Sequence, residues 1–258
     1  MLAGMSIYVV LTIALVAAVW VLLIDVRALK AGGIVVLANP FGLPLMVAVL
    51  VLALYLALSA AVSVARDRES GVLEVLFYAP VDELSYSLGK IAGLVLAYIL
   101  LLPLILAAFA ALAFLTGFVL TKAVVVGLLL SVVSAAATIA FGVLLAIGTN
   151  RVRIAVLVLI GVTVLLIGVS LLYRVVLLLP VEDPASSVLP LRDALAALDG
   201  VMRWISPFAW LERTIDATLA GAWSAALRNL AATLAGAAGM VAVAALWLRR
   251  RGVLHKEG

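Results

Sequence analysis

The main feature of the sequence is a series of long, uninterrupted runs of apolar residues. Six of them reach the length of about 20 residues that an α-helix needs to cross the hydrocarbon core of a bilayer. Because apolar residues do not alternate with polar ones along these runs, the pattern favours helices over the strands of a membrane barrel. The predicted spans cover residues 3–24, 41–65, 91–118, 123–148, 154–179 and 226–248.

The composition strengthens this prediction. The chain has 258 residues, of which 68% are hydrophobic and 12% charged, and its mean hydropathy is +1.38. Soluble domains carry about 25% charged residues, so a soluble globule is excluded. We predict an all-α, polytopic protein whose single transmembrane domain, residues 1–258, lies in the lipid bilayer. The chain has no cysteine, which excludes disulfides and thiolate metal sites. The basic residues lie in short loops, so no nucleic-acid partner is predicted.

The distribution of basic residues predicts the orientation in the membrane. Arg249–Arg251 follows the last span directly, and Arg151 and Arg153 lie in the short loop between the fourth and fifth spans. Loops rich in Lys and Arg remain on the cytoplasmic side. We therefore predict a multi-pass protein of the plasma membrane with both termini in the cytoplasm. The loop 66–90 is then cytoplasmic, and the long loop 180–225 lies outside.

The outer loop is predicted to form two amphipathic helices. They are separated by Ser206–Pro207, and each has apolar residues at helical spacing. Such helices usually lie on the membrane surface or cap a bundle, so we expect a packing lid or, alternatively, a substrate gate. The two apolar stripes are Leu191, Leu195, Leu198, Met202 and Ile205, and then Phe208, Leu211, Ile215 and Leu219.

The span interiors carry no ionisable residue. Arg174 lies close enough to the outer end of its span to extend towards water. Ion-coupled carriers normally keep ionisable residues within the bilayer, so this reading argues against such a carrier and leaves a channel open. No carboxylate pair, Ser–His arrangement or metal-ligand cluster is placed for catalysis, and no metal site is predicted. We interpret the mid-span Tyr55, Tyr98 and Thr138 as partners in interhelical hydrogen bonds.

The chain also lacks a nucleotide-binding motif. Gly89–Lys90 is followed by Ile91 rather than Ser or Thr, and Leu84 stands where a phosphate loop begins with Gly. We predict no cofactor in this chain. If ATP drives the protein, a separate subunit binds the ATP and Mg²⁺.

The charged interruption at 66–90 is the main functional clue. After Arg66–Arg68, apolar residues follow one side of about three helical turns, and Pro80 ends that helix. Asp82 is placed as the N-cap of the next helix, which continues into the third span. Gly89 and Gly93 would let another helix approach closely. From the residues alone, a coupling element and a solvated connecting loop are equally supported.

This segment resembles the signature loop of the ABC-2-type permeases, the membrane subunits of ATP-binding-cassette exporters. Val72 stands where the family usually has Thr, and Asp82 replaces the usual Ser or Thr cap. Ser206–Pro207–Phe208 also resembles a segment of the family's outer loop. The matching positions in the signature loop are Glu69, Gly71, Leu73, Glu74, Leu76, Pro80, Gly89 and Lys90.

The resemblance implies a function. Residues 69–80 would form a coupling helix that docks on a cassette-type ATPase, and the permease would pair with a second copy or a paralogue to export a substrate. Gly71 would allow close approach of the helix, Leu73 and Leu76 would be anchors, Glu69 and Glu74 would be polar contacts, and Pro80 would end the helix. The alternatives are a membrane scaffold that recruits an ATPase without transporting, or a channel-like protein.

Overall fold

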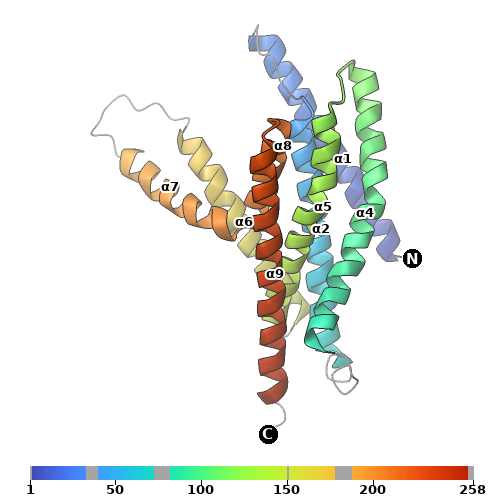
Figure 1. Ribbon diagram of the computed structural model, residues 1–258, viewed down its shortest axis with the longest axis vertical. Helices are drawn as coiled ribbons and strands as arrows, with labels where there is room; N and C mark the ends of the chain where they lie inside the picture. The colour runs from blue at the N-terminus through green and yellow to red at the C-terminus, as the bar shows by residue number, and fades with distance from the viewer. Residues whose placement is uncertain (1, 33–39, 73–81, 150, 178–187, 255–258) are drawn as a thin grey trace.

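The computed structural model describes residues 2–32, 40–72, 82–149, 151–177 and 188–254, and every regular element within these ranges is an α-helix (Figure 1). The all-helical prediction is therefore confirmed. The helices are α1 (Leu2–Gly32), α2 (Gly42–Glu69), α4 (Glu83–Thr116), α5 (Lys122–Ile147), α6 (Val152–Leu177), α7 (Val188–Ile205), α8 (Pro207–Leu219) and α9 (Trp223–Leu254).

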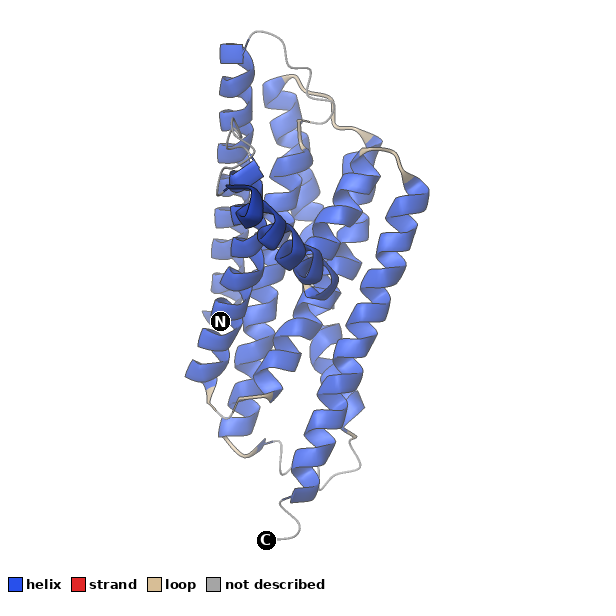
Figure 2. Ribbon diagram, turned by 90° about the vertical axis from the view of Figure 1, so that its left-hand side faces the viewer, coloured by secondary structure: helices blue, strands red, loops and turns tan. Residues whose placement is uncertain are grey.

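Six of these helices are long and apolar enough to cross a membrane, as the sequence predicts: α1, α2, α4, α5, α6 and α9. Figures 1 and 2 show them as a bundle of helices that run mainly along the long axis of the molecule. We define the lower end of the bundle as the end where α2 and α5 stop, α4 and α6 start, and the C-terminus lies (bottom of Figure 1). The upper end carries the turn between α4 and α5 and the start of α9.

Helix α5 is the centre of the bundle and packs against α2, α4, α6, α8 and α9. Its contact with α2 is close because small side chains line both helices. A Cβ atom added at Gly142 would lie 2.4 Å from the carbonyl oxygen of Ala57. Ala53, Ala57, Ala60 and Ala61 on α2 are fully buried. Small residues are the usual means of close helix approach in membranes, where lipid is as apolar as the side chains.

One of the predicted interhelical hydrogen bonds is confirmed. The hydroxyls of Tyr98 on α4 and Ser131 on α5 are 2.7 Å apart, and both side chains are buried. The prediction is wrong for Thr138, because its hydroxyl donates to the carbonyl of Ser134 one turn earlier in its own helix. A threonine in a helix can satisfy its hydroxyl locally, whereas a tyrosine hydroxyl extends too far from its own backbone to do so.

Helices α7 and α8 form a hairpin in which α8 enters the bundle, whereas α7 lies outside it against α6 (Figure 1). The ring of Phe208, at the start of α8, packs edge-on against Phe141 of α5, with centroids 6.3 Å apart. Phe141 lies six residues before the end of α5, or about 9 Å at 1.5 Å per residue. A Cβ at Gly236 of α9 would overlap the ring of Trp210. The expectation of a surface or capping position is therefore wrong for α8, which is packed between α2, α5 and α9.

Helix α7 also differs from its predicted orientation. Its polar residues Arg192 and Asp199 contact α6, whereas Leu191, Leu198 and Ile205 are exposed. The predicted apolar stripe is therefore divided between the two sides of the helix. The physical reason is that Arg192 and Asp199 find polar partners on α6, while exposed leucines cost nothing when the surrounding solvent is lipid.

Gly142 provides a test of the α2–α5 contact. The variant Gly142→Ala should lower the free energy of unfolding by about 1–3 kcal/mol, the usual cost of overpacking a core, because its methyl group would overlap the Ala57 carbonyl. Gly161→Ala on α6 is the matched control, since a Cβ there meets no atom within 4 Å. The measurement is thermal or denaturant unfolding of the purified protein in detergent. Equal stability of the two variants would contradict the close contact.

Candidate functional site

Three consecutive charged residues at the lower end of α2, Asp67, Arg68 and Glu69, each contact a different part of the bundle. Asp67 contacts the first turns of α4, Arg68 the end of α5, and Glu69 the start of α6. These contacts, together with Ser63, Tyr86 and Lys90, are called the lower clamp below. Helices α4, α5 and α6 are thereby all attached to the last turn of α2.

The contact with α4 is built around the carboxylate of Asp67. Lys90 Nζ lies 2.7 Å from Asp67 Oδ2, and the hydroxyl of Tyr86 donates to the same oxygen at 2.8 Å. Lys90 also donates to the hydroxyl of Ser63 at 2.7 Å and lies 5.7 Å from the centre of the Tyr86 ring. The side chains of Asp67 and Lys90 are 22% and 29% exposed, so water screens this pair only in part.

The contacts with α5 and α6 satisfy the ends of two helices. Arg68 Nη1 donates to the carbonyls of Ile147 and Thr149, and the second of these bonds is 3.1 Å long. The backbone N–H of Val152 donates to Glu69 Oε2 at 3.2 Å. The last carbonyls and the first N–H groups of a helix have no partners within it. A cation near the last carbonyls, or an anion near the first N–H groups, also interacts favourably with the helix dipole. Arg68 and Glu69 therefore fix the lower ends of α5 and α6.

The turn after α2 explains the need for glycine at position 71. The N–H groups of Ser70 and Gly71 donate to the carbonyls of Arg66 and Arg68, and Gly71 has a φ of +73°. Residues with a Cβ rarely adopt this left-handed conformation, and glycine does so without strain. A Cβ at Gly71 would meet nothing within 4 Å. Within this chain Gly71 is therefore needed for the conformation of the turn. Its role in the close approach of a helix from a partner protein stays a prediction.

The other predicted site residues fall into two groups. Leu73, Glu74, Leu76 and Pro80 lie outside the described residues. Asp82 immediately precedes α4, with an extended backbone of φ −81° and ψ 158°, but its carboxylate accepts no capping hydrogen bond from the backbone. The hydroxyl of Ser85 lowers the pKa of Asp82.

The predicted close approach at Gly89 and Gly93 does not occur within the described part of the chain. A Cβ added at either position would meet no atom within 4 Å. The described residues also contain no group of His, Cys, Asp or Glu side chains that could hold a metal ion. The contacts at the lower end join the end of α2 to the ends of α4, α5 and α6.

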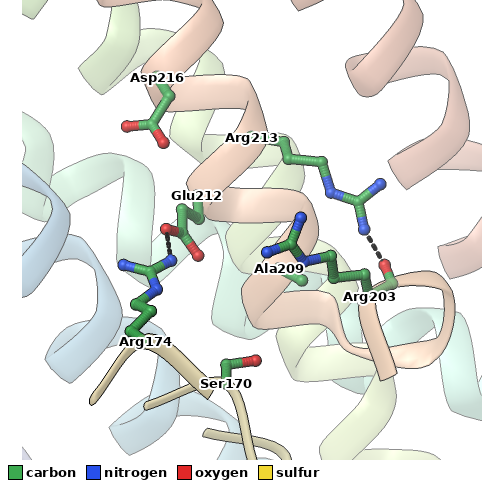
Figure 3. Close-up of a pocket in the computed structure, with 7 residues that line it drawn as sticks. All are labelled: Ser170, Arg174, Arg203, Ala209, Glu212, Arg213 and Asp216. Carbon is green, nitrogen blue, oxygen red and sulfur yellow. Dashed lines mark hydrogen bonds and ion pairs between the residues drawn. The ribbon is translucent and has the colours of Figure 1, made fainter. Parts of the chain in front are cut away.

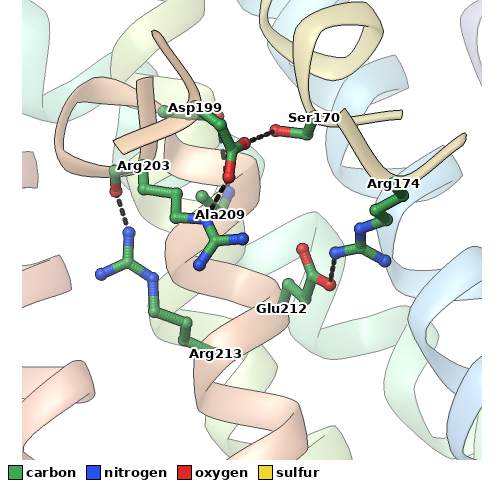
Figure 4. Close-up of polar contacts among 8 residues, drawn as sticks. Ser170, Arg174, Asp199, Arg203, Ala209, Glu212 and Arg213 are labelled. Atoms are coloured by element: carbon green, nitrogen blue, oxygen red, sulfur yellow. Dashed lines mark hydrogen bonds and ion pairs between the residues drawn. The ribbon is translucent and has the colours of Figure 1, made fainter. Parts of the chain in front are cut away.

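A second polar cluster, which the sequence did not predict, lies between α6, α7 and α8 (Figures 3 and 4). Arg174 of α6 forms an ion pair with Glu212 of α8. Asp199 of α7 pairs with Arg203 at 2.6 Å and accepts a hydrogen bond of 2.7 Å from Ser170 of α6. The sequence predicts that Arg174 extends towards water, and it does not reveal the ion pair with Glu212. The sequence alone could not identify Glu212 as this partner, because Glu212 lies 38 residues further along the chain, in a helix whose position only the tertiary structure gives.

The chain was compared with known proteins. The model of a family described as ABC-2 family transporter protein matches residues 38–246, which is well over half of the chain. The match includes the lower clamp and the polar cluster of α6, α7 and α8. No curated protein and no solved structure matches the chain.

The lower clamp gives a prediction about stability. Asp67→Asn and Lys90→Gln, made singly and together, should show a coupling energy of about 1 kcal/mol in a double-mutant cycle, because the pair is largely withdrawn from water and shares a hydrogen-bond network. The measurement is denaturant unfolding in detergent. The control cycle uses Arg66→Gln and Glu83→Gln, since Arg66 and Glu83 form no ion pair in the described structure. A coupling energy as small as that of the control would contradict the contact.

Proposed function

The chain belongs to the ABC-2 family of transporter proteins, and from this premise we propose that it is the permease subunit of an ATP-driven exporter. A separate cassette-type ATPase would bind the ATP and Mg²⁺ and dock on residues 69–80. A second permease subunit, identical or paralogous, would complete the transport pathway. The lower end of the bundle would face the cytoplasm.

The observation that carries the proposal is the lower clamp. The first residue of the proposed docking segment, Glu69, is the last residue of α2, and α4 begins at Glu83, three residues after the segment ends. Glu69 and its neighbour Arg68 also hold the ends of α5 and α6. A displacement of the segment by a partner would therefore act on four spanning helices at once. A helix end that served only to lead into a connecting loop would not need contacts with two further helices.

The proposed orientation is supported by exposed basic residues at the lower end. Arg66, Arg151, Arg153 and Arg249 are all exposed there. Clusters of Arg near the ends of spans are typical of the cytoplasmic side. With this orientation, the lower clamp would lie on the side of the membrane where an ATPase has access to ATP.

The first test is co-purification with a cassette-type ATPase expressed together with the chain. Leu76→Asp should lower the amount of bound ATPase by about tenfold or more, because a buried leucine anchor contributes about 1.5–3 kcal/mol and tenfold corresponds to 1.4 kcal/mol. Val119→Asp is the control: it makes the same kind of change at an exposed position in the turn between α4 and α5, at the upper end. If both variants bind the ATPase as the wild type does, the docking assignment is wrong. A bound ATPase whose hydrolysis moves no substrate would favour the scaffold alternative.

The second test separates coupling from docking. Arg68→Gln should leave ATPase binding unchanged but release the α5–α6 turn from α2, because the carbonyls of Ile147 and Thr149 lose their charged donor. The natural chain has no cysteine, so spin labels can be placed at Val72→Cys and Arg153→Cys alone. Their separation should stay constant when ATP is added to the complex and should change in the Arg68→Gln background. Arg66→Gln is the control, and identical behaviour of the two backgrounds would contradict the coupling role of Arg68.

A further inference from the structure

The cluster between α6, α7 and α8 surrounds a pocket of about 230 Å³. The pocket extends along α8, from Ala209 in its first turn to Asp216 in its last turn. Arg174 is three residues before the end of α6, and Asp216 three residues before the end of α8, which corresponds to about 5 Å in each case. The lining residues are Ser170, Arg174, Arg203, Ala209, Glu212, Arg213 and Asp216 (Figure 3).

Two of the charged residues in this pocket form no ion pair within the described part of the chain. The pairs Arg174–Glu212 and Arg203–Asp199 account for four charges. Arg213 forms no ion pair among the described residues. It donates to the carbonyl of Arg203, and its Nε is buried without a partner. Asp216 likewise forms no ion pair within the described part of the chain. A buried donor without a partner costs free energy, so a ligand that supplies an acceptor would be favoured there.

The two unpaired charges lie on different sides of the pocket. In Figure 3, Arg203 and Arg213 are on one side of α8, and Glu212 and Asp216 are on the other. The pocket therefore offers guanidinium donors at one side and carboxylate acceptors at the other. Arginine binds phosphate oxygens through two parallel hydrogen bonds, and a carboxylate accepts hydrogen bonds from a primary ammonium. A phosphate joined through two carbons to an ammonium would satisfy both sides.

The surroundings favour a lipid as the source of this group. The side chains of Arg174 and Arg203 are 50% and 49% exposed, so the pocket is open to the outside of the bundle. Leu171 and Val175, beside Ser170 and Arg174 on α6, are exposed, as are Val201 and Trp204 on α7. Exposed aliphatic residues suit acyl chains, and tryptophan prefers the level of the headgroups. A soluble ligand without acyl chains would gain no binding energy from these exposed apolar side chains.

We propose that the pocket binds the headgroup of a phospholipid that carries a phosphate and a primary ammonium, that is, a phosphoethanolamine headgroup. The phosphate lies between Arg203 and Arg213, and the ammonium faces Asp216 and Glu212. The acyl chains follow the exposed faces of α6 and α7. This site is independent of the ATPase and of transport, so its test does not depend on the proposed function.

The test measures lipid retained by the purified chain in mild detergent, by native mass spectrometry. The added lipids share the same acyl chains and carry phosphoethanolamine, phosphocholine or phosphoglycerol headgroups. The phosphoethanolamine lipid should be retained best, because phosphocholine has no N–H to donate and phosphoglycerol has no cation. This comparison uses the natural chain and therefore does not depend on the folding of any variant. Equal retention of the three lipids would overturn the proposal.

Variants then locate the site. Arg213→Gln and Asp216→Asn should each lower retention of the phosphoethanolamine lipid by about tenfold, the loss expected for one charge-assisted hydrogen bond. Arg228→Gln and Asp193→Asn are matched controls at exposed positions of α9 and α7 outside the pocket, and they should retain lipid as the natural chain does. Retention that falls equally in variants and controls would overturn the assignment. So would displacement of the lipid by free phosphoethanolamine at a similar concentration, which would identify a soluble ligand.

Discussion

The close contact of α2 with α5 is the constraint on which the rest of the bundle depends. In lipid, helices gain little from hiding apolar surface, so association relies on packing at short distance. Gly142 brings the backbone of α5 against that of α2 at Ala57. Helices α4, α8 and α9 all pack against α5, and α1 packs against α2. The lower ends of α2 and α5 are therefore held side by side, where Arg68 can reach the carbonyls of Ile147 and Thr149.

The polar contacts follow from the same environment. In the middle of the bundle the structure uses short, neutral contacts such as Tyr98 with Ser131, because a charge there would be costly. Ion pairs occur towards the helix ends, where Asp67–Lys90 and Arg174–Glu212 connect separate helices. At the lower end these charges also supply the partners that the helix termini lack, so one set of side chains satisfies the backbone and fixes the arrangement of the helices.

The sequence predicts the spans well because a long apolar run has few alternatives to a membrane helix, and the structure places spanning helices over all six runs. The sequence also predicts that residues 66–90 are polar, but it does not predict which parts of the bundle their charged side chains contact. It predicts Glu69 as a contact for a partner protein, and it does not reveal that the same carboxylate accepts a hydrogen bond from the N–H of Val152, 83 positions away in the chain. The orientation of α7 could not be predicted for the same reason. A helical stripe shows which residues share a face, and only the neighbouring helix decides which face turns inward.

Helix α6 connects the two polar clusters. Its first turn is held by Glu69 at the lower end, and near its upper end Ser170 and Arg174 contact Asp199 and Glu212. Between these contacts much of its surface is exposed, including Leu157, Val164 and Leu165. The backbone hydrogen bonds of such a helix keep it stiff, so a displacement of one end would be passed on to the other. A movement of the lower clamp would therefore reach the α7–α8 hairpin through α6 more directly than through the closely packed α5.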